Sequence, residues 1–221
     1  LENRERRAKE HSDENLPMPA HVPVFRSKLL NVEEAEKEEK EKFLKALEVL
    51  SPCDYIVIDT PGSDMYLSRL AHSHADTLIT PLNDSFIDLD MLALLDSETL
   101  EIKKPSTYSE MVWDQKKERA IRDKKTIDWI VLRNRLSAIS SRNKEEMSAV
   151  LNKLSKRIGF RLVEGFGERV IFRELFLNGI TLLDLQETKT QMNLSHVAAR
   201  QELRQLLDLI QIPKNKVAKV A

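Results

Sequence analysis

Residues 55–62 read Tyr-Ile-Val-Ile-Asp-Thr-Pro-Gly. The first four residues are apolar on both faces and favour β structure, as in a central strand of a parallel sheet that is covered on both sides. The apolar run stops at Asp59, and Thr60, Pro61 and Gly62 predict a polar loop directly after it. Ligands of α/β proteins bind at the carboxyl ends of such strands, so this stretch predicts both the fold class and the place of the site.

Strand-like and helix-like segments alternate through the rest of the chain. Short strands are predicted at residues 76–80, 129–132 and 160–163. Apolar residues at helical spacing predict helices over residues 29–50, 86–95, 143–158 and 199–210. The alternation predicts an α/β fold with a mostly parallel sheet flanked by helices.

The ends of the predicted strands carry polar side chains. Asp59, Asn83 and Asn134 all fall at carboxyl ends, where the site is expected. After Asn83, Ser85 and Asp88 have the spacing of a capping box, and the helix that they begin is apolar all round. We therefore expect that helix to be buried.

The composition divides the chain into three parts. Residues 1–30 are polar and contain three prolines before residue 24, which predicts an extended or loop segment of the same domain. The main domain is predicted over residues 31–212, followed by a tail at 213–221. Cys53 is the single cysteine, which we expect to be a small core residue in a reducing compartment.

The chain has no feature of a membrane or secreted protein. No apolar stretch approaches the roughly 20 residues of a bilayer span, and the charged start is neither a signal peptide nor an initiating Met. We expect a soluble protein whose beginning is missing.

Charge is unevenly distributed, although the net charge of the 221 residues is only −1. Residues 131–173 carry 10 Lys+Arg and 4 Asp+Glu, whereas residues 31–64 carry 4 and 10. The basic region could contact phosphate backbones, although solvated helix faces also explain most charge runs. Its candidate contacts are Arg133, Arg135, Arg142, Lys144, Arg157, Arg161, Arg169 and Arg173.

A strand that ends in Asp-Thr-Pro-Gly is how nucleotide hydrolases present an acidic motif. Asp59 would orient a water on Mg²⁺, and Gly62 would let its backbone amide approach the terminal phosphate. An ordinary turn at a strand end is the alternative. The glycine-rich loop with a lysine that such a site also needs does not occur, because none of the five glycines lies in a G-x-x-x-x-G-K-[S/T] pattern.

The residues available for recognising the base favour adenine over guanine. The nearest candidate for guanine recognition, Asn143-Lys144, is followed by Glu where an Asp is needed, and it opens a helix. Asn134 ends a strand, and its amide could both donate to and accept from the adenine edge, although a turn-capping Asn is the alternative. His72 and His74 lack companion ligands at suitable spacing, so a metal site is not expected there.

Several stretches together resemble one protein family. They are YIVIDTPGSD (55–64), TPLNDSFIDLDML (80–92), DWIVLRNRL (128–136), RVIFRELFLNGITLLDL (169–185) and HVAARQELRQLL (196–207). They resemble the MipZ branch of the ParA/MinD family of deviant P-loop ATPases. The similarity extends over nearly the whole chain, and the NDSF and LRNRL segments distinguish this branch from general ParA proteins.

The resemblance implies an ATPase that places the bacterial division plane. Such a protein dimerises on binding ATP with Mg²⁺, associates with DNA nonspecifically, interacts with the centromere-binding protein ParB and inhibits FtsZ assembly. It is cytoplasmic, nucleoid-associated and polar.

The resemblance also assigns roles to residues of this chain. It implies that Asp59 lies near magnesium, that Thr60 to Gly62 form a switch, and that Asn134 contacts adenine. Arg142, Lys144 and Arg169 match positions of the DNA-binding face.

By this resemblance, the family's first strand, phosphate loop and first helix lie before Leu1. We therefore expect the 221-residue chain neither to bind nor to hydrolyse ATP appreciably, and its full-length parent to do both. The alternative is a DNA- or protein-binding module on a degenerate nucleotide-binding fold. A reductase of the nitrogenase iron-protein type is not expected, because it needs several cluster-ligating cysteines.

Overall fold

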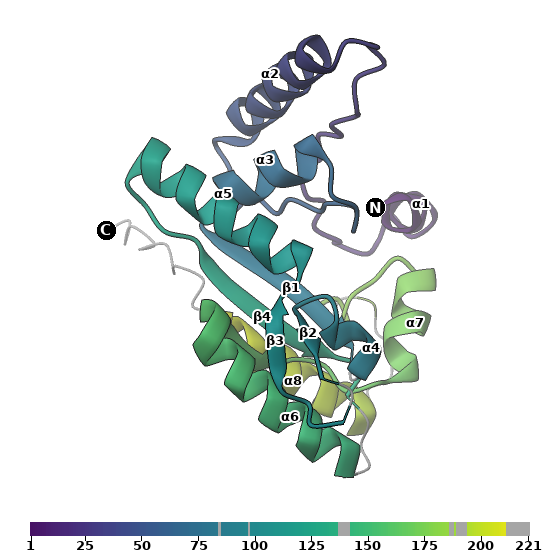
Figure 1. The fold of residues 1–221 in the computed structure, drawn as a ribbon. Coiled ribbons are helices and arrows are strands. Elements are labelled where there is room, and N and C mark those ends of the chain that lie inside the picture. The colour runs from purple at the N-terminus through teal and green to yellow at the C-terminus, as the bar shows by residue number, and fades with distance from the viewer. Residues whose placement is uncertain (84, 97, 137–141, 186–187, 189–193, 211–221) are drawn as a thin grey trace, which may run out of the picture.

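The computed structural model describes residues 1–83, 85–96, 98–136, 142–185, 188 and 194–210 (Figure 1). Its centre is a parallel sheet with the strand order β1-β4-β5. The strands are β1 (Thr77–Asn83), β4 (Asp128–Asn134) and β5 (Arg161–Glu164). The three strands predicted after residue 75 and the α/β fold class are confirmed.

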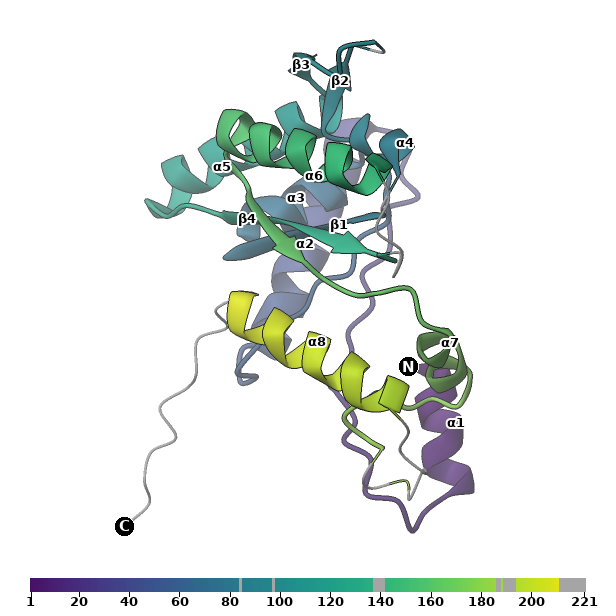
Figure 2. The ribbon, with the colours of Figure 1, turned by 90° about the horizontal axis from the view of Figure 1, so that it is seen from below.

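Helices connect the parallel strands and cover the sheet. α5 (Thr107–Asp123) lies between β1 and β4 in the chain, and α6 (Arg142–Leu154) lies between β4 and β5. Figure 2 shows α5 and α6 on one side of the sheet and α8 (Leu194–Ile210) on the other. The helix predicted over residues 143–158 is confirmed, with a π-helical last turn at Ser155–Gly159. The predicted final helix is also confirmed, as α8.

Each face of β4 packs against a different helix, which explains its continuous apolar sequence. On one face, the fully buried Trp129 belongs to the same core cluster as Leu151 of α6. On the other face, Ile130 packs in a cluster with Leu206 of α8. Burying a side chain of this size stabilises the fold by about 1.5–3 kcal/mol. These two clusters make β4 the central strand.

The prediction of a strand at residues 55–58 is wrong. The segment has no regular secondary structure, and its apolar side chains are exposed, up to 91% for Val57. A strand is held by hydrogen bonds to a neighbouring strand, and no described strand pairs with these residues. Cys53, expected in the core, is exposed in the same part of the chain.

β1 is an edge strand within the described part of the chain, since it pairs only with β4. The Asp128 amide donates to the Asp76 carbonyl, so the even-numbered residues of β1 direct their backbone groups towards β4. Odd-numbered residues then face the other edge. Pro81 is one of them, and it lacks the N–H that a further strand would need there.

The prediction of one buried helix over residues 86–95 is also wrong. α4 covers only Phe86–Leu89, and β2 (Ala93–Leu95) then pairs antiparallel with β3 (Ile102–Pro105). Leu89 is fully buried, but Ile87 is 81% exposed. A four-residue helix buries one side only, although the sequence is apolar all round.

The start of α4 matches its predicted cap in part. The Ser85 hydroxyl accepts a hydrogen bond of 3.2 Å from the Ile87 amide. The Asp88 carboxylate does not reach back to Ser85. It accepts a bond of 2.9 Å from the amide of Asn83, the last residue of β1. Asp88 therefore shapes the loop that follows the strand.

The first 30 residues are not wholly extended, because Glu2–Glu10 form helix α1. α1 has no buried residue and lies against the end of α7 (Val170–Leu177), as Figure 2 shows. Its side chains donate to the carbonyls that end α7 and begin the next turn. These donors are Asn3, Arg4, Arg6 and Arg7, and the acceptors are Phe176, Gly179, Leu177 and Asn178. Positive side chains at these carbonyls stabilise a helix C-terminus.

The helix predicted over residues 29–50 is confirmed as α2 (Val32–Leu50). Its N-cap is Asn31, whose side chain accepts from the Glu34 amide. α3 (Tyr66–His74) follows and packs beside α2 through Phe43 and Leu70. The tail predicted at residues 213–221 lies outside the described residues.

Candidate functional site

Two asparagines meet at the carboxyl edge of the sheet. Asn83 ends β1, Asn134 ends β4, and the two are directly paired in register. Adjacent strands lie about 4.8 Å apart, so the two carboxamides begin side by side. Asn83 is exposed and Asn134 is half-buried. The edge therefore presents two amide side chains, each able to donate and to accept.

A glycine keeps this edge closely packed. Gly165 directly follows β5, and a Cβ there would lie 2.3 Å from the carbonyl oxygen of Arg133. Any side chain at residue 165 would thus push β5 away from the end of β4. Sequence reasoning gave Gly165 no role, because the close approach depends on two strands that are distant in the chain.

Asp59, Thr60, Pro61 and Gly62 do not join the asparagines. All but the half-buried Thr60 are exposed. Among the described residues, no hydrogen bond or strand pairing links 59–62 to β1 or β4. The sequence predicts Asp59 and Asn134 at the carboxyl ends of strands in one sheet, and the structure gives the Asp59 segment no place in the described sheet.

A side-chain ion pair holds the residues that follow this loop. The guanidinium of Arg69 donates to both carboxylate oxygens of Asp64, at 2.6 and 2.7 Å. This hydrogen-bonded pair lowers the pKa of the Asp64 carboxyl. The pair links Asp64, which precedes α3, to Arg69 within the helix.

The residues present do not fit a bound nucleoside triphosphate with its magnesium ion. Gly62 has open space around it, with nothing within 4 Å of an added Cβ, so a phosphate could approach its amide. However, the printed sequence has no glycine-lysine loop, and the Asp59 segment is not joined to the edge that carries Asn134. The described residues therefore include groups suited to a nucleotide site, but these groups are not assembled into one.

The expected DNA contacts have mixed surroundings. Arg169 donates to the Glu202 carboxylate at 2.6 Å, and this bond raises the Arg169 pKa. Glu202 also accepts from the Gly167 amide at 3.3 Å. Arg142 and Lys144 lie in the first turn of α6, and their side chains are outside the described part of the structure.

Other arginines of the basic region are engaged within the protein. Arg133 is only 2% exposed, and it donates to the Ser148 hydroxyl at 2.8 Å. Arg161 forms an ion pair of 2.6 Å with Asp128. The positive surface is therefore smaller than the count of charges predicts.

The histidines at residues 72 and 74 lie in α3. In the described part of the chain, no group of three or more His, Cys, Asp and Glu side chains could hold a metal ion. The Nδ1 atom of each histidine lies at hydrogen-bond distance from the carbonyl four residues earlier, in Ser68 and Leu70. Both imidazoles therefore contact the backbone of their own helix.

The parallel sheet, its covering helices and the polar carboxyl edge define an α/β fold of the P-loop NTPase type. The family model described as ATPase MipZ matches residues 1–214. The chain belongs to this family, whose members are ATPases related to cell division. None of the curated proteins matches it significantly. Among the residues described, no helix has the length and apolar character needed to cross a membrane.

Proposed function

We propose that this protein is an ATP-dependent spatial regulator of bacterial cell division. It dimerises with ATP and Mg²⁺, binds DNA nonspecifically as a dimer, interacts with a ParB-like protein and inhibits FtsZ assembly. Its place is the cytoplasm, on the nucleoid and near the cell poles. The observation that carries the proposal is the family match over residues 1–214.

The proposal assigns the acidic role to Asp59, the switch to Thr60, Pro61 and Gly62, and an adenine contact to Asn134. These groups are not assembled in the described chain, and the printed sequence has no phosphate-binding loop. We therefore expect no measurable binding when the 221-residue chain is dialysed against Mg²⁺-ATP. Tight binding to this chain would contradict these assignments.

The decisive experiment uses the product of the whole open reading frame that contains these codons. We expect ATP to dimerise it, as measured by light scattering after size exclusion. Asp59→Ala and Gly62→Ala should abolish turnover, and Asp54→Ala, at the other end of the apolar run, is the control. Gly62→Ala is informative because its new Cβ meets nothing within 4 Å, so the loss would not come from misfolding. Unchanged turnover in both variants would refute the assignment.

The DNA-binding part of the proposal can be tested through salt dependence. If Arg142, Lys144 and Arg169 contact phosphates, changing each to Gln should reduce the slope of log K against log salt by about 0.9. Because Glu202 engages Arg169, Glu202→Gln should release the guanidinium and strengthen DNA binding. Arg69→Gln, outside the basic region, is the control. A slope that no variant changes would refute the assignment.

The second candidate is a binding module without catalysis on a degenerate nucleotide-binding fold. The lack of strand pairing between the Asp59 segment and the described sheet favours it. It predicts that DNA binding by the whole gene product is the same with and without ATP, whereas the leading proposal requires ATP.

A further inference from the structure

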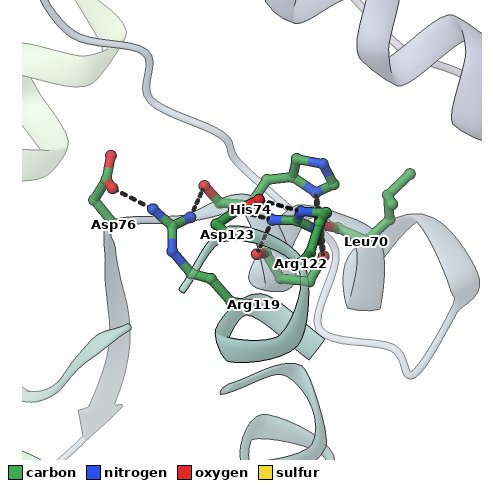
Figure 3. A network of polar contacts seen from close by, with 7 residues as sticks. Leu70, His74, Asp76, Arg119, Arg122 and Asp123 are labelled. Atoms are coloured by element: carbon green, nitrogen blue, oxygen red, sulfur yellow. Dashed lines mark hydrogen bonds and ion pairs between the residues drawn. The ribbon is translucent and has the colours of Figure 1, made fainter. Parts of the chain in front are cut away.

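The C-terminal end of α3 is held by side chains of α5 at the amino end of the sheet (Figure 3). Arg122 donates to the carbonyl of Ser73 at 2.8 Å. Arg119 donates to the carbonyl of His74 and to the carboxylate of Asp76. The last carbonyls of a helix have no partner within the helix, so these two arginines supply the missing donors.

The imidazole of His74 lies where three helices meet. Its Nδ1 is 2.9 Å from the carbonyl oxygen of Leu70. The ring of Phe43 from α2 packs edge-on against the imidazole, with centroids 5.2 Å apart. His74 therefore joins the end of α3 to both neighbouring helices.

The groups that face His74 are arranged for a neutral ring. α5 presents Arg119, Arg122 and Asp123, and α2 presents the apolar ring of Phe43. The Arg122 Nη1 lies 3.4 Å from Nδ1 of His74. Asp123 already accepts two bonds from Arg122, at 2.8 and 2.7 Å. An imidazolium would thus be a third cation beside two carboxylates, Asp123 and Asp76, each of which already accepts from an arginine.

Burial and the charges of Arg122 and Arg119 lower the pKa of His74, against opposing effects of the Leu70 carbonyl and Asp123. The helix C-terminus also favours a positive ring. Burial and the two guanidinium groups outweigh the Leu70 carbonyl and Asp123, so the pKa is lowered. The neutral ring thus favours the closed contact between α3 and α5.

We propose that His74 is a pH-sensitive latch between α3 and α5. With a neutral ring, the end of α3 is fastened to Arg122 and packed against Phe43. Protonation places a third positive charge at this point and loosens the end of the helix. This proposal does not depend on ATP binding.

Hydrogen exchange of the 221-residue chain tests the latch. After correction for intrinsic exchange rates, we expect the last-turn amides of α3 to open several-fold more often at about pH 5.5 than at about pH 7.5. His74→Gln cannot be protonated in this range and should remove the dependence. Arg122→Gln removes the nearest cation and should reduce it. His21→Gln, an exposed histidine outside the cluster, should behave as the wild type.

A direct titration of the wild-type protein complements the variants. The imidazole resonance of His74 should titrate below the ordinary value of about 6.5, and Arg122→Gln should raise its midpoint. The proposal is overturned if His74→Gln keeps the wild-type pH dependence, or if His74 titrates at or above its ordinary value. If His74→Gln fails to fold, the wild-type titration and Arg122→Gln still decide.

Discussion

The ion pair between Arg4 and Asp184 joins α1 to the segment that follows α7 and permits a quantitative prediction. The guanidinium donates to both carboxylate oxygens, at 2.7 and 2.9 Å. The side chains are only 13% and 7% exposed. Asp184 also accepts from the amide and the hydroxyl of Thr181, each at 2.7 Å. Asp184→Asn should therefore weaken the attachment of α1 strongly.

The lowered pKa of Asp184 gives the size of its contribution to the unfolding free energy. The bond from Arg4, with the bonds from Thr181, lowers this pKa from 3.8 to about 2, against the effect of burial. That difference corresponds to about 2 kcal/mol of unfolding free energy above the unfolded-state pKa. Because the folded-state pKa is depressed, this stability is fully present above about pH 5 and is lost as pH falls towards 2.

Urea unfolding of the wild type and of Asp184→Asn at several pH values measures the effect. We expect the difference in unfolding free energy to be about 2 kcal/mol at pH 7 and to shrink below about pH 4. Asp64→Asn is the matched control, since Asp64 also binds an arginine with two bonds but is 42% exposed. It should cost about 0.5 kcal/mol or less. Equal costs for the two variants, or a pH-independent difference for Asp184→Asn, would refute the reasoning.

Two further comparisons use paired variants. Gly165→Ala should destabilise by about 2–3 kcal/mol, since its Cβ would lie 2.3 Å from the Arg133 carbonyl oxygen. Gly62→Ala should stay within about 0.5 kcal/mol in the same thermal melts. Asp76→Asn should cost about 3 kcal/mol despite the 85% exposure of Asp76, because it leaves the guanidinium of Arg119, 4% exposed, without its counter-charge. Arg119→Met leaves a carboxylate that water can solvate, so urea midpoints should show a smaller loss, about 1 kcal/mol; the opposite ranking would contradict this account.

Similar apolar runs have different outcomes in this protein. Residues 129–132 and 55–58 both have the composition of a buried strand. The first run became β4, because it has a strand on each side and a helix on each face. The second has no paired strand among the described residues and remains exposed. Composition predicts the preference for a strand, whereas pairing depends on distant segments.

The hairpin of β2 and β3 was missed for a local reason. Residues 86–95 are apolar except for Asp88 and Asp90, so periodicity does not distinguish one helix from a short helix followed by a strand. The turn of the hairpin is organised by Asp96, which accepts from the amides of Glu98 and Thr99 at 3.0 Å. A side chain that binds the backbone two or three residues later is typical of turns, and this signal was available in the sequence.

The sequence motifs by themselves indicated the family. Local chemistry determined three strands, three helices and two asparagines at one edge of the sheet. These features depend on side-chain spacing within short segments. Tertiary structure alone decided that no described strand pairs with the Asp59 segment, that Arg169 is engaged by Glu202, and that α1 is held by Asp184. Ion pairing and strand pairing join residues that are distant in sequence, so no local pattern specifies which partners meet.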